Sequence, residues 1–431
     1  MNNMSNLEAK FKETGIGPIP EEWNVLSLEE AVDFNPRRSI KKGQLVKFVA
    51  MTEIDPFTKK IKSFSEKPFS GGTKFKNGDT LMARITPCLE NGKIAYVDFL
   101  QNEEVAGGST EYIVLSGKKG VSDPSYVYYL TISPEIRQAA ITAMTGTTGR
   151  QRVENDKLAS KLIALPPLQE QERIASILSS LDDKIELNRQ MNATLEKIAS
   201  TLFKHWFVDF EFPDKNGKPY KSSGGKMVES ELGEIPEGWR VGKMSDLIRV
   251  ESGFPFSSGM FDDTGEYGLV TIKNVQNGIF VSECTDHLAN FPFKMPEYCK
   301  LESGDILISL TGNVGRVCIV NGDGFVLNQR VAKLAPVEES NRAFVYVYSR
   351  RSEFQNDLIN ISRGTAQQNL SPVEMKNLET VIPGVNVLAL FGEVTGSIFE
   401  MIVENLNHIK ALSEIRDSLL PRLMNGKIRA R

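Results

Sequence analysis

The feature that most constrains this chain is an internal repeat, because two copies of one sequence pattern fold into two copies of one structural unit. Residues 17–25 (GPIPEEWNV) resemble residues 233–241 (GEIPEGWRV) at an offset of 216 positions. Matches at similar offsets follow in the same order: residues 77–79 with 303–305, 126–128 with 344–346, 146–147 with 364–365, and Pro166 with Pro383. The 431-residue chain is therefore predicted to be a duplication.

Each copy has the same predicted order of elements. Short β-rich runs, such as KIAYV, EYIVL, DILISL and FVLNQRVAKL, are bounded by Gly, Asn, Asp and Pro turn residues. A helical stretch follows, at residues 125–144 in the first copy and 342–361 in the second. A Gly-Thr loop then leads to a strand that ends at Pro166 or Pro383, and a long helix begins after that proline.

The two long helices carry apolar residues at alternating spacings of four and three, which is typical of a coiled coil. The first is predicted over about residues 168–207, without internal Pro or Gly. Because about 200 residues separate the helices, an intramolecular pair can run antiparallel; the alternative is that each packs on a separate core. The predicted seam comprises Ile174, Leu178, Leu181, Ile185, Asn188, Leu195 and Leu202 with Phe391, Ile398, Ile402, Asn405, Ile409, Leu412 and Leu419.

These patterns predict an α+β fold with two pseudo-symmetric α/β domains joined by long helices that form an antiparallel coiled coil. A helix of this length spans on the order of 55 Å, which suits a ligand with two separated half-sites. The predicted regions are a tail (1–14), a first domain (15–167), a first spacer helix (168–210), a linker (211–232), a second domain (233–384) and a second spacer helix (385–431).

The sequence offers no catalytic or metal centre. It contains no phosphate-binding P-loop, no dinucleotide fingerprint, no His-Glu-x-x-His and no Gly-x-Ser-x-Gly motif. The four cysteines form no Cys-x-x-Cys pair, so reduced thiols are expected. No run approaches the roughly 20 apolar residues of a membrane span, and a cytoplasmic protein is expected.

The landmark residues of the two copies match, but the polar segments between these landmarks differ. This is expected if the two copies bind different DNA sequences. The net charge of -4 requires that any DNA-binding charge be local or supplied by a partner. Arg, Lys, Asn and Gln read base edges, with Ser and Thr as adaptable partners. The candidates are Arg84, Thr86, Asn91, Lys93, Ser109, Thr110, Thr147, Arg150 and Gln151 in the first copy, and Thr311, Asn313, Arg316, Asn328, Gln329, Arg330, Thr365, Gln367 and Gln368 in the second.

Two alternatives apply to these positions. Each candidate could instead be an ordinary solvated turn residue. Glu90 and Glu111 could accept hydrogen bonds from cytosine amino groups or could hold a neighbouring arginine in place.

Several long segments resemble the specificity subunits of type I restriction-modification systems. Residues 205–239 (HWFVDFEFPDK to EIPEGW) are similar to the junction of that family, and residues 165–190 and 416–429 to its conserved helical regions. ARITPCLENGK with GSTEYIVL is similar to one of its target-recognition domains, and GDILISLTGNVG with LNQRVAKL to another. The resemblance covers the chain after about residue 15.

The resemblance implies that each domain is a target-recognition domain for double-stranded DNA and that the helices dock two DNA methyltransferase subunits. The assembly would methylate adenine in each half of an asymmetric bipartite site. Motor-endonuclease restriction subunits would join through the methyltransferase. S-adenosylmethionine, ATP and Mg²⁺ would bind the partner subunits, so this chain would hold no cofactor and would not be an enzyme alone.

One departure from the family pattern stands out, because the second helix lacks the Gln169-Glu170-Gln171 start of the first. Its methyltransferase contact is therefore expected to differ. Two other function classes stay open from the residues alone: a duplicated protein-interaction scaffold that does not bind DNA, and a standalone nuclease or methyltransferase, which the missing motifs disfavour.

Overall fold

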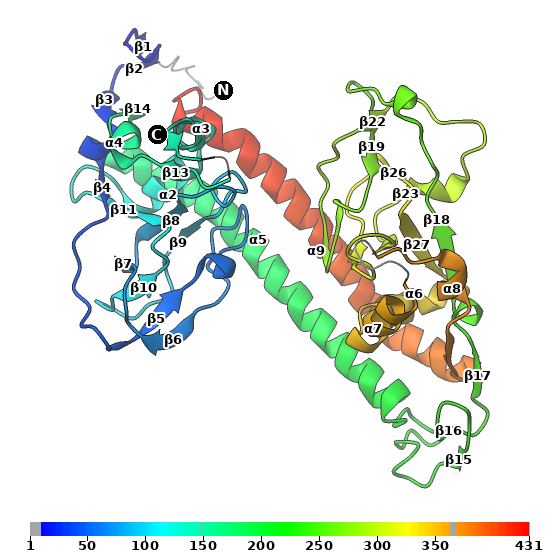
Figure 1. Cartoon of the computed structure of the whole chain (residues 1–431). Coiled ribbons are helices and arrows are strands. Elements are labelled where there is room, and N and C mark those ends of the chain that lie inside the picture. Colours follow the sequence, from blue (N-terminus) through cyan, green and yellow to red (C-terminus); the bar gives the residue numbers. More distant parts are fainter. Residues whose placement is uncertain (1–9, 148, 363–367, 431) are drawn as a thin grey trace, which may run out of the picture. The chain divides into compact units, whose positions relative to one another are not determined.

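The computed structural model describes residues 10–147, 149–362 and 368–430 (Figure 1). The chain divides into unit 1, Met1–Glu186 with Leu412–Arg431, and unit 2, Leu187–Ala411. Helices α5 (Leu168–Phe203) and α9 (Val385–Met424) each contribute residues to both units. Each unit thus contains one domain and one arm of each long helix.

Two four-stranded sheets form the first domain. Their strand orders are β4-β11-β8-β9 and β6-β5-β10-β7, and β5 and β10 pair in parallel while the other neighbours are antiparallel. The strands are β4 (Val32–Phe34), β5 (Leu45–Val49), β6 (Ser65–Pro68), β7 (Thr73–Phe75), β8 (Asp79–Ala83), β9 (Ile94–Tyr96), β10 (Ala106–Gly108) and β11 (Tyr112–Gly117).

The second domain repeats this topology. Its sheets have the orders β18-β27-β24-β25 and β22-β19-β26-β23, again with one parallel pair, β19 with β26. Because both the orders and the position of the parallel pair agree, the predicted duplication is confirmed. The strands are β18 (Ile248–Ser252), β19 (Tyr267–Val270), β22 (His287–Leu288), β23 (Lys300–Leu301), β24 (Ile306–Ser309), β25 (Val317–Ile319), β26 (Phe325–Leu327) and β27 (Val331–Pro336).

Two-stranded ribbons complete each domain. A ribbon that joins the start of the domain to the strand before the long helix is β3 (Asn24–Ser27) with β14 (Leu162–Leu165) in unit 1, and β17 (Arg240–Lys243) with β28 (Glu379–Ile382) in unit 2. The remaining ribbons are β1 (Phe11–Lys12) with β2 (Ile19–Pro20), β12 (Met144–Thr145) with β13 (Arg152–Val153), β15 (Met227–Val228) with β16 (Ile235–Pro236), and β20 (Val275–Gln276) with β21 (Ile279–Phe280).

The run FVLNQRVAKL is not one strand, as its β-rich pattern suggested, but two strands that lie in different sheets. The chain turns between β26 and β27, where Arg330 has a φ of 74°, a left-handed conformation that ends an extended run. The first domain has the same corner between β10 and β11, at residues 109–111. Alternation of side chains along a strand does not reveal such a change of sheet.

The predicted helical stretches are confirmed, but each is a pair of short helices. In unit 1 they are α2 (Pro124–Ile132) and α3 (Pro134–Thr142), and in unit 2 α6 (Arg342–Ser349) and α7 (Ser352–Ile361). Asp123 caps α2 by accepting from the backbone N–H of Tyr126 at 2.8 Å. Ser133 ends α2 because the following proline disfavours helical geometry there. The other short helices are α1 (Leu28–Ala31), α4 (Asn155–Ala159) and α8 (Pro372–Lys376).

In each unit the arms of α5 and α9 pack in a shared core. Ile174 and Leu178 of α5 lie in one apolar cluster with Leu420 and Leu423 of α9 in unit 1. The arms run antiparallel, since Asp182 binds Arg416 while the earlier Glu170 binds the later Arg429.

Unit 2 has the same arrangement. Asn192 bonds to Asn405, while the later Trp206 packs on the earlier Phe391 with ring centroids 5.6 Å apart. Every predicted seam residue is buried or half-buried. The fold is thus two pseudo-symmetric domains with an antiparallel helix pair, rather than two helices on separate cores.

The long helices differ from the predicted regions at their ends. α5 ends at Phe203 and continues as a π-helical turn, Lys204–Val208. α9 ends at Met424, before the end of the region predicted as the second spacer helix. The nearby Gly426 has a φ of 72°, which is incompatible with a continuing helix.

The residues that start α5 fasten it to the first domain. Gln171 is fully buried, and its side-chain amide donates to the carbonyl oxygens of Val121 and Pro166 at 2.9 Å each. Glu170 accepts from Trp23 at 3.0 Å and from Arg429 at 2.6 and 2.8 Å. In the described structure these two side chains therefore anchor the helix, which gives the Gln169-Glu170-Gln171 start a structural role.

Among the described helices, α9 is long and apolar enough to cross a membrane by length and composition alone. Its sequence is not one contiguous apolar run, because Glu393, Glu400 and Glu404 interrupt it. Core helices of soluble proteins can pass the same test. Part of the apolar surface of α9 belongs to the cores described above.

The polar residues of the seam are not equivalent. Asn405 donates to the side-chain oxygen of Asn192 at 2.8 Å, and Asn192 donates to the carbonyl oxygen of Ile402 at 3.2 Å. Asn188 is 1% exposed, and within the described residues its side-chain N–H₂ group has no hydrogen-bond acceptor. Asn192 therefore contributes a specific contact to the seam, whereas Asn188 carries a desolvation cost.

We expect Asn188→Leu to raise the free energy of unfolding by about 1 kcal/mol, because leucine removes a buried donor without an acceptor and adds apolar contact. Asn192→Leu is the matched control and should lower it by about 1–3 kcal/mol, since it leaves the Asn405 donor unsatisfied. Thermal and urea unfolding of the two variants measure the difference. A loss of stability in Asn188→Leu as large as in the control would contradict this account.

Candidate nucleic-acid interface

Three loops that are distant in sequence meet at one edge of the first domain. They are the β8–β9 loop (residues 84–93), the corner between β10 and β11 (109–111), and the described residues of the Gly-Thr loop between β12 and β13 (146–147 and 149–151). The backbone N–H of Thr86 donates to the carbonyl oxygen of Gln151 at 3.1 Å, and that of Arg84 to Glu111 at 2.9 Å. These backbone bonds hold the loops side by side.

The second domain assembles the same edge. There the β24–β25 loop (residues 310–316) contacts the corner between β26 and β27 and the segment that starts at Gln368. The backbone N–H of Leu310 donates to the carbonyl oxygen of Arg330 at 2.9 Å, and that of Gly312 to Gln368 at 3.0 Å. Both domains therefore bring together three segments that contain predicted DNA-contacting residues.

The candidates differ in their exposure. Thr365 and Gln367 lie outside the described residues. The exposed candidates are Asn91, Thr110, Thr147, Arg150, Asn313, Gln329 and Arg330. The half-buried candidates are Arg84, Thr86, Lys93, Ser109, Gln151, Arg316, Asn328 and Gln368, and Thr311 is buried.

Five candidates are committed to side-chain contacts between segments of the protein, and one of them is Thr86, whose hydroxyl donates to the carbonyl oxygen of Gln151 at 3.3 Å. Lys93 donates from Nζ to the carbonyl oxygen of Met51 at 2.7 Å, and Arg84 from Nη2 to that of Val153 at 3.3 Å. Thr311 donates from its hydroxyl to the side-chain oxygen of Asn369 at 2.9 Å, and Arg316 donates to the side chain of Gln276. These five side chains hold the loops in place, so the exposed candidates present the donors and acceptors of the edge that a ligand can reach.

Glu111 holds an arginine in place, which decides between the two roles left open for it. Arg152 donates from Nε and Nη2 to the Glu111 carboxylate at 2.7–3.2 Å. The hydrogen bonds and charge of Arg152 lower the pKa of Glu111, so the carboxylate is ionised and already paired. Glu90 differs, because only its backbone carbonyl oxygen accepts from Arg137, at 2.7 Å, and its Oε2 atom is buried without a hydrogen-bond donor among the described residues.

Arg152 was not among the sequence-predicted residues, although it lies at the end of the Gly-Thr loop and its side chain is 46% exposed. The alternation of Arg150 and Arg152 around Gln151 could have indicated it. Its bidentate contact with Glu111 fixes the guanidinium group in one orientation.

The matching motifs Asn77-Gly78-Asp79 and Ser303-Gly304-Asp305 form turns next to β8 and β24, the strands that lead into the β8–β9 and β24–β25 loops. Asp79 accepts from the backbone N–H of Lys76 at 2.7 Å and from Arg38, and both charged side chains are almost fully buried. Asp305 accepts from the backbone N–H of Glu302 at 2.9 Å and pairs with Lys333 at 2.9 Å. Each aspartate thus closes the turn at the start of β8 or before β24 and pairs with a cation, which is almost fully buried in the case of Arg38 and half-buried in the case of Lys333.

The edge offers hydrogen-bonding groups on a surface rather than an acid–base constellation in a cleft. Within the described residues, no cluster of three or more His, Cys, Asp or Glu side chains is suited to a metal ion. Burial raises the pKa of the Cys284 thiol to about 11, so this sulfur is protonated at neutral pH and is not a nucleophile. What the arrangement can do chemically is bind.

Comparison with known proteins matches the two repeats directly. Residues 20–197 and 236–403 match the family model described as type I restriction modification DNA specificity domain. The chain is 28% identical over 440 residues to the type I restriction enzyme MjaIX specificity subunit of Methanocaldococcus jannaschii, covering 98% of this chain and 97% of the relative. It is 32% identical over 395 residues to the EcoAI specificity subunit of Escherichia coli, covering 73% and 67%.

The crystal structure of the type I restriction-modification S subunit from M. genitalium has the same fold, with a TM-score of 0.50 at 15% identity, covering 96% of this chain and 98% of that one. The family model accounts for more than half of the chain, in two copies that coincide with the two repeats. The chain belongs to the DNA specificity family of type I restriction-modification systems.

Proposed function

We propose that this chain is the sequence-specific DNA-recognition subunit of a type I restriction-modification complex, and that each domain reads one half of an asymmetric bipartite site. The observation that carries the proposal is the three-loop edge, which is built twice on one topology with different exposed side chains. Two copies of one frame with two different surfaces suit two different half-sites.

The exposed side chains are of the types that read bases. Gln329 and Arg330 occupy the corner of the second domain, where the first domain has Thr110 and Glu111 at the equivalent positions. Glutamine and arginine form bidentate contacts with adenine and guanine, whereas threonine is an adaptable partner. Because backbone bonds already fix the loops, binding needs little further ordering of the chain.

The long helices supply a surface suited to protein partners. Outside the seam they expose large apolar side chains, namely Ile177, Leu187, Met191 and Ile198 on α5, and Val394, Met401 and Ile415 on α9. Apolar side chains that recur along an exposed helix indicate a protein interface. We assign this surface to two DNA methyltransferase subunits, which would carry S-adenosylmethionine, while restriction subunits that use ATP and Mg²⁺ would join through them.

The acidic net charge fits this assignment. A complex that clamps DNA with several subunits distributes the phosphate contacts among them, so a chain with a net charge of -4 need not neutralise the duplex alone. A protein-interaction scaffold that does not bind DNA would have no need for two different polar edges on matching frames.

Substitution of equivalent corner residues should alter one half-site each. We expect Gln329→Ala to weaken discrimination at one base pair of one half-site by about fivefold or more, because a bidentate base contact contributes about 1–3 kcal/mol. Thr110→Ala, the matched change in the first domain, should affect only the other half-site. The measurement is methylation of a DNA library by the chain reconstituted with its methyltransferase.

Two results would contradict the domain assignment. One is a change in both half-sites from either single substitution. The other is the absence of any bipartite sequence among the DNA methylated with the unsubstituted chain, which would favour the scaffold alternative.

The helices should set the spacing between the half-sites. Insertion of seven residues after Glu186 in α5 and seven after Ala411 in α9 lengthens each helix by about 10 Å, so the preferred spacer should grow by about three base pairs. An insertion in α5 alone is the control and should disrupt the helix pair. Altered half-site bases in the double insertion would exclude the helices as the spacing element.

A further inference from the structure

A lysine of the first domain is buried against helix α5. Lys59 lies in the segment before β6 and is 8% exposed. Its ammonium nitrogen lies 5.1 Å from the ring centroid of Tyr129, 5.4 Å from that of Tyr96 and 5.8 Å from that of Tyr128. Three aromatic rings around one cation give an attraction that depends on the position of the cation.

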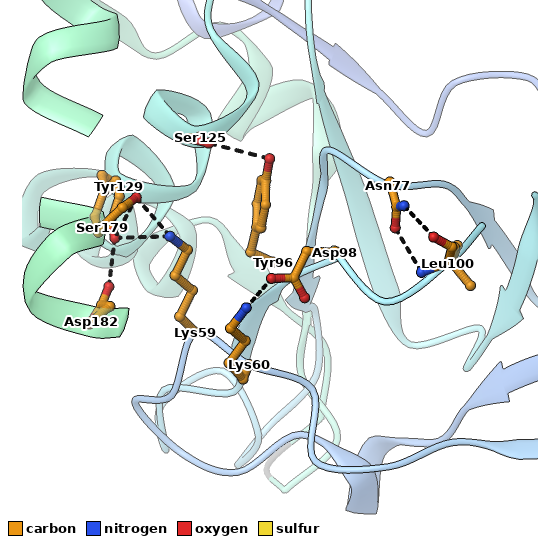
Figure 2. A network of polar contacts seen from close by, with 10 residues as sticks. All are labelled: Lys59, Lys60, Asn77, Tyr96, Asp98, Leu100, Ser125, Tyr129, Ser179 and Asp182. Carbon is orange, nitrogen blue, oxygen red and sulfur yellow. Dashed lines mark hydrogen bonds and ion pairs between the residues drawn. The ribbon is translucent and has the colours of Figure 1, made fainter. Parts of the chain in front are cut away.

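Within unit 1 the lysine contacts Tyr129 of the domain and Ser179 of α5 (Figure 2), and Asp182 extends this contact to α9. Its Nζ donates to the Ser179 hydroxyl of α5 at 2.8 Å and lies 3.2 Å from the Tyr129 hydroxyl. The Tyr129 hydroxyl donates to Asp182 of α5 at 2.6 Å, and Asp182 accepts from Arg416 of α9 at 2.8 Å. One polar chain thus runs from a loop of the domain through α2 and α5 to α9.

Burial of the Lys59 ammonium group costs desolvation free energy unless its partners are held in a defined geometry. Burial lowers the pKa of Lys59, and the carboxylates of Asp182 and Asp183 oppose that shift by favouring the charged form. Apolar packing of similar volume would stabilise the interface at least as well, because a buried charge must overcome its desolvation. Apolar packing is also non-directional, however, and it would let the domain tilt on the helix.

We propose that Lys59 is a positioning residue that fixes the orientation of the first recognition domain on α5, and thereby sharpens the spacer length that the complex accepts. The inference rests on the proposed function. The Lys59 side chain faces Tyr129 and Ser179, while its segment is bonded to the β8–β9 loop by the backbone N–H of Phe57, which donates to the carbonyl oxygen of Gly92 at 3.0 Å. Its contribution to recognition therefore passes through the angle at which the domain presents its loops.

Unit 2 holds its own domain on α5 by different chemistry. Tyr346 donates its hydroxyl to Glu196 of α5, and Arg350 lies 3.4 Å from the same carboxylate. Each domain therefore has a buried or half-buried polar contact with this helix. The Lys59 contact differs because its cation comes from a loop of the first domain and enters a cage of aromatic rings.

The test is methylation of DNA with fixed half-sites and spacers one base pair shorter than, equal to and one longer than the preferred length. The full chain is reconstituted with its methyltransferase and S-adenosylmethionine. Lys59→Met retains the length of the side chain and its aromatic packing but removes the charge. We expect it to reduce the preference for the correct spacer by about fivefold or more, with unchanged half-site bases.

Two further variants make the result specific. Lys60→Met is the matched control, because Lys60 pairs with Asp98 at a more exposed position and interacts with Asp183 and Glu186 of the helix only through charge at longer range. It should leave the spacer preference unchanged. Tyr129→Phe removes only the hydroxyl between Lys59 and Asp182, and it should broaden spacer tolerance in the same direction even if Lys59→Met does not fold.

Three outcomes would overturn the inference: an unchanged spacer preference in folded Lys59→Met and Tyr129→Phe, a uniform loss of activity on all spacers, or altered half-site bases. A uniform loss would show that Lys59 only stabilises the domain. The proposed function fails separately, if the unsubstituted chain methylates no bipartite site at all.

Discussion

Buried ion pairs between α5 and the C-terminal part of the chain hold unit 1 together. Asp182 binds Arg416 at 2.8 Å and Glu170 binds Arg429 at 2.6 Å, with all four side chains at most 10% exposed. Unit 1 is built from both ends of the chain, so its C-terminal arm can dock only after the second domain has been made. The apolar seam supplies much of the stabilisation, but apolar contacts tolerate sliding. Paired charges that are desolvated do not, because a shift would leave each of them buried without a partner.

At the candidate interface, too, different groups have different roles: backbone groups hold the loops in place, and side chains are free to vary. Backbone hydrogen bonds such as that from Thr86 to Gln151 hold the loops, and backbone bonds do not depend on side-chain identity. Side chains at Thr110 or Gln329 can therefore vary without loss of the frame. This explains how two copies of one sequence can keep the same sheet order while their exposed residues diverge, as the proposed reading of two different half-sites requires.

The duplication, the short helices and the long paired helices could be predicted from the sequence, since each leaves a periodic or collinear pattern in the chain. The change of sheet at Arg330 could not, because the residues around it read as one extended run. The roles of Lys93 and Arg84 were also beyond sequence reasoning. A donor that faces a base and one that faces a carbonyl oxygen have the same chemistry, and only the fold shows that Met51 and Val153 accept these bonds. Lys59 was missed for a related reason, since Ser179 is 120 positions away.

The two domains are fixed to α5 by different side chains, and this has a consequence for how specificity can change. Under the proposed function, the exposed loops determine which bases are contacted, whereas Lys59 with Ser179 and Asp182 in unit 1, or Tyr346 with Glu196 in unit 2, determines how the loops are presented. A change of loop side chains leaves these docking contacts intact. Exchange of a whole domain breaks these docking contacts, because a domain that carries Lys59 needs a helix with a hydrogen-bond acceptor at position 179 and a carboxylate at position 182. Half-site identity and spacer length are therefore separable for point substitutions but coupled for domain exchange, unless the docking residues of the helix travel with the domain.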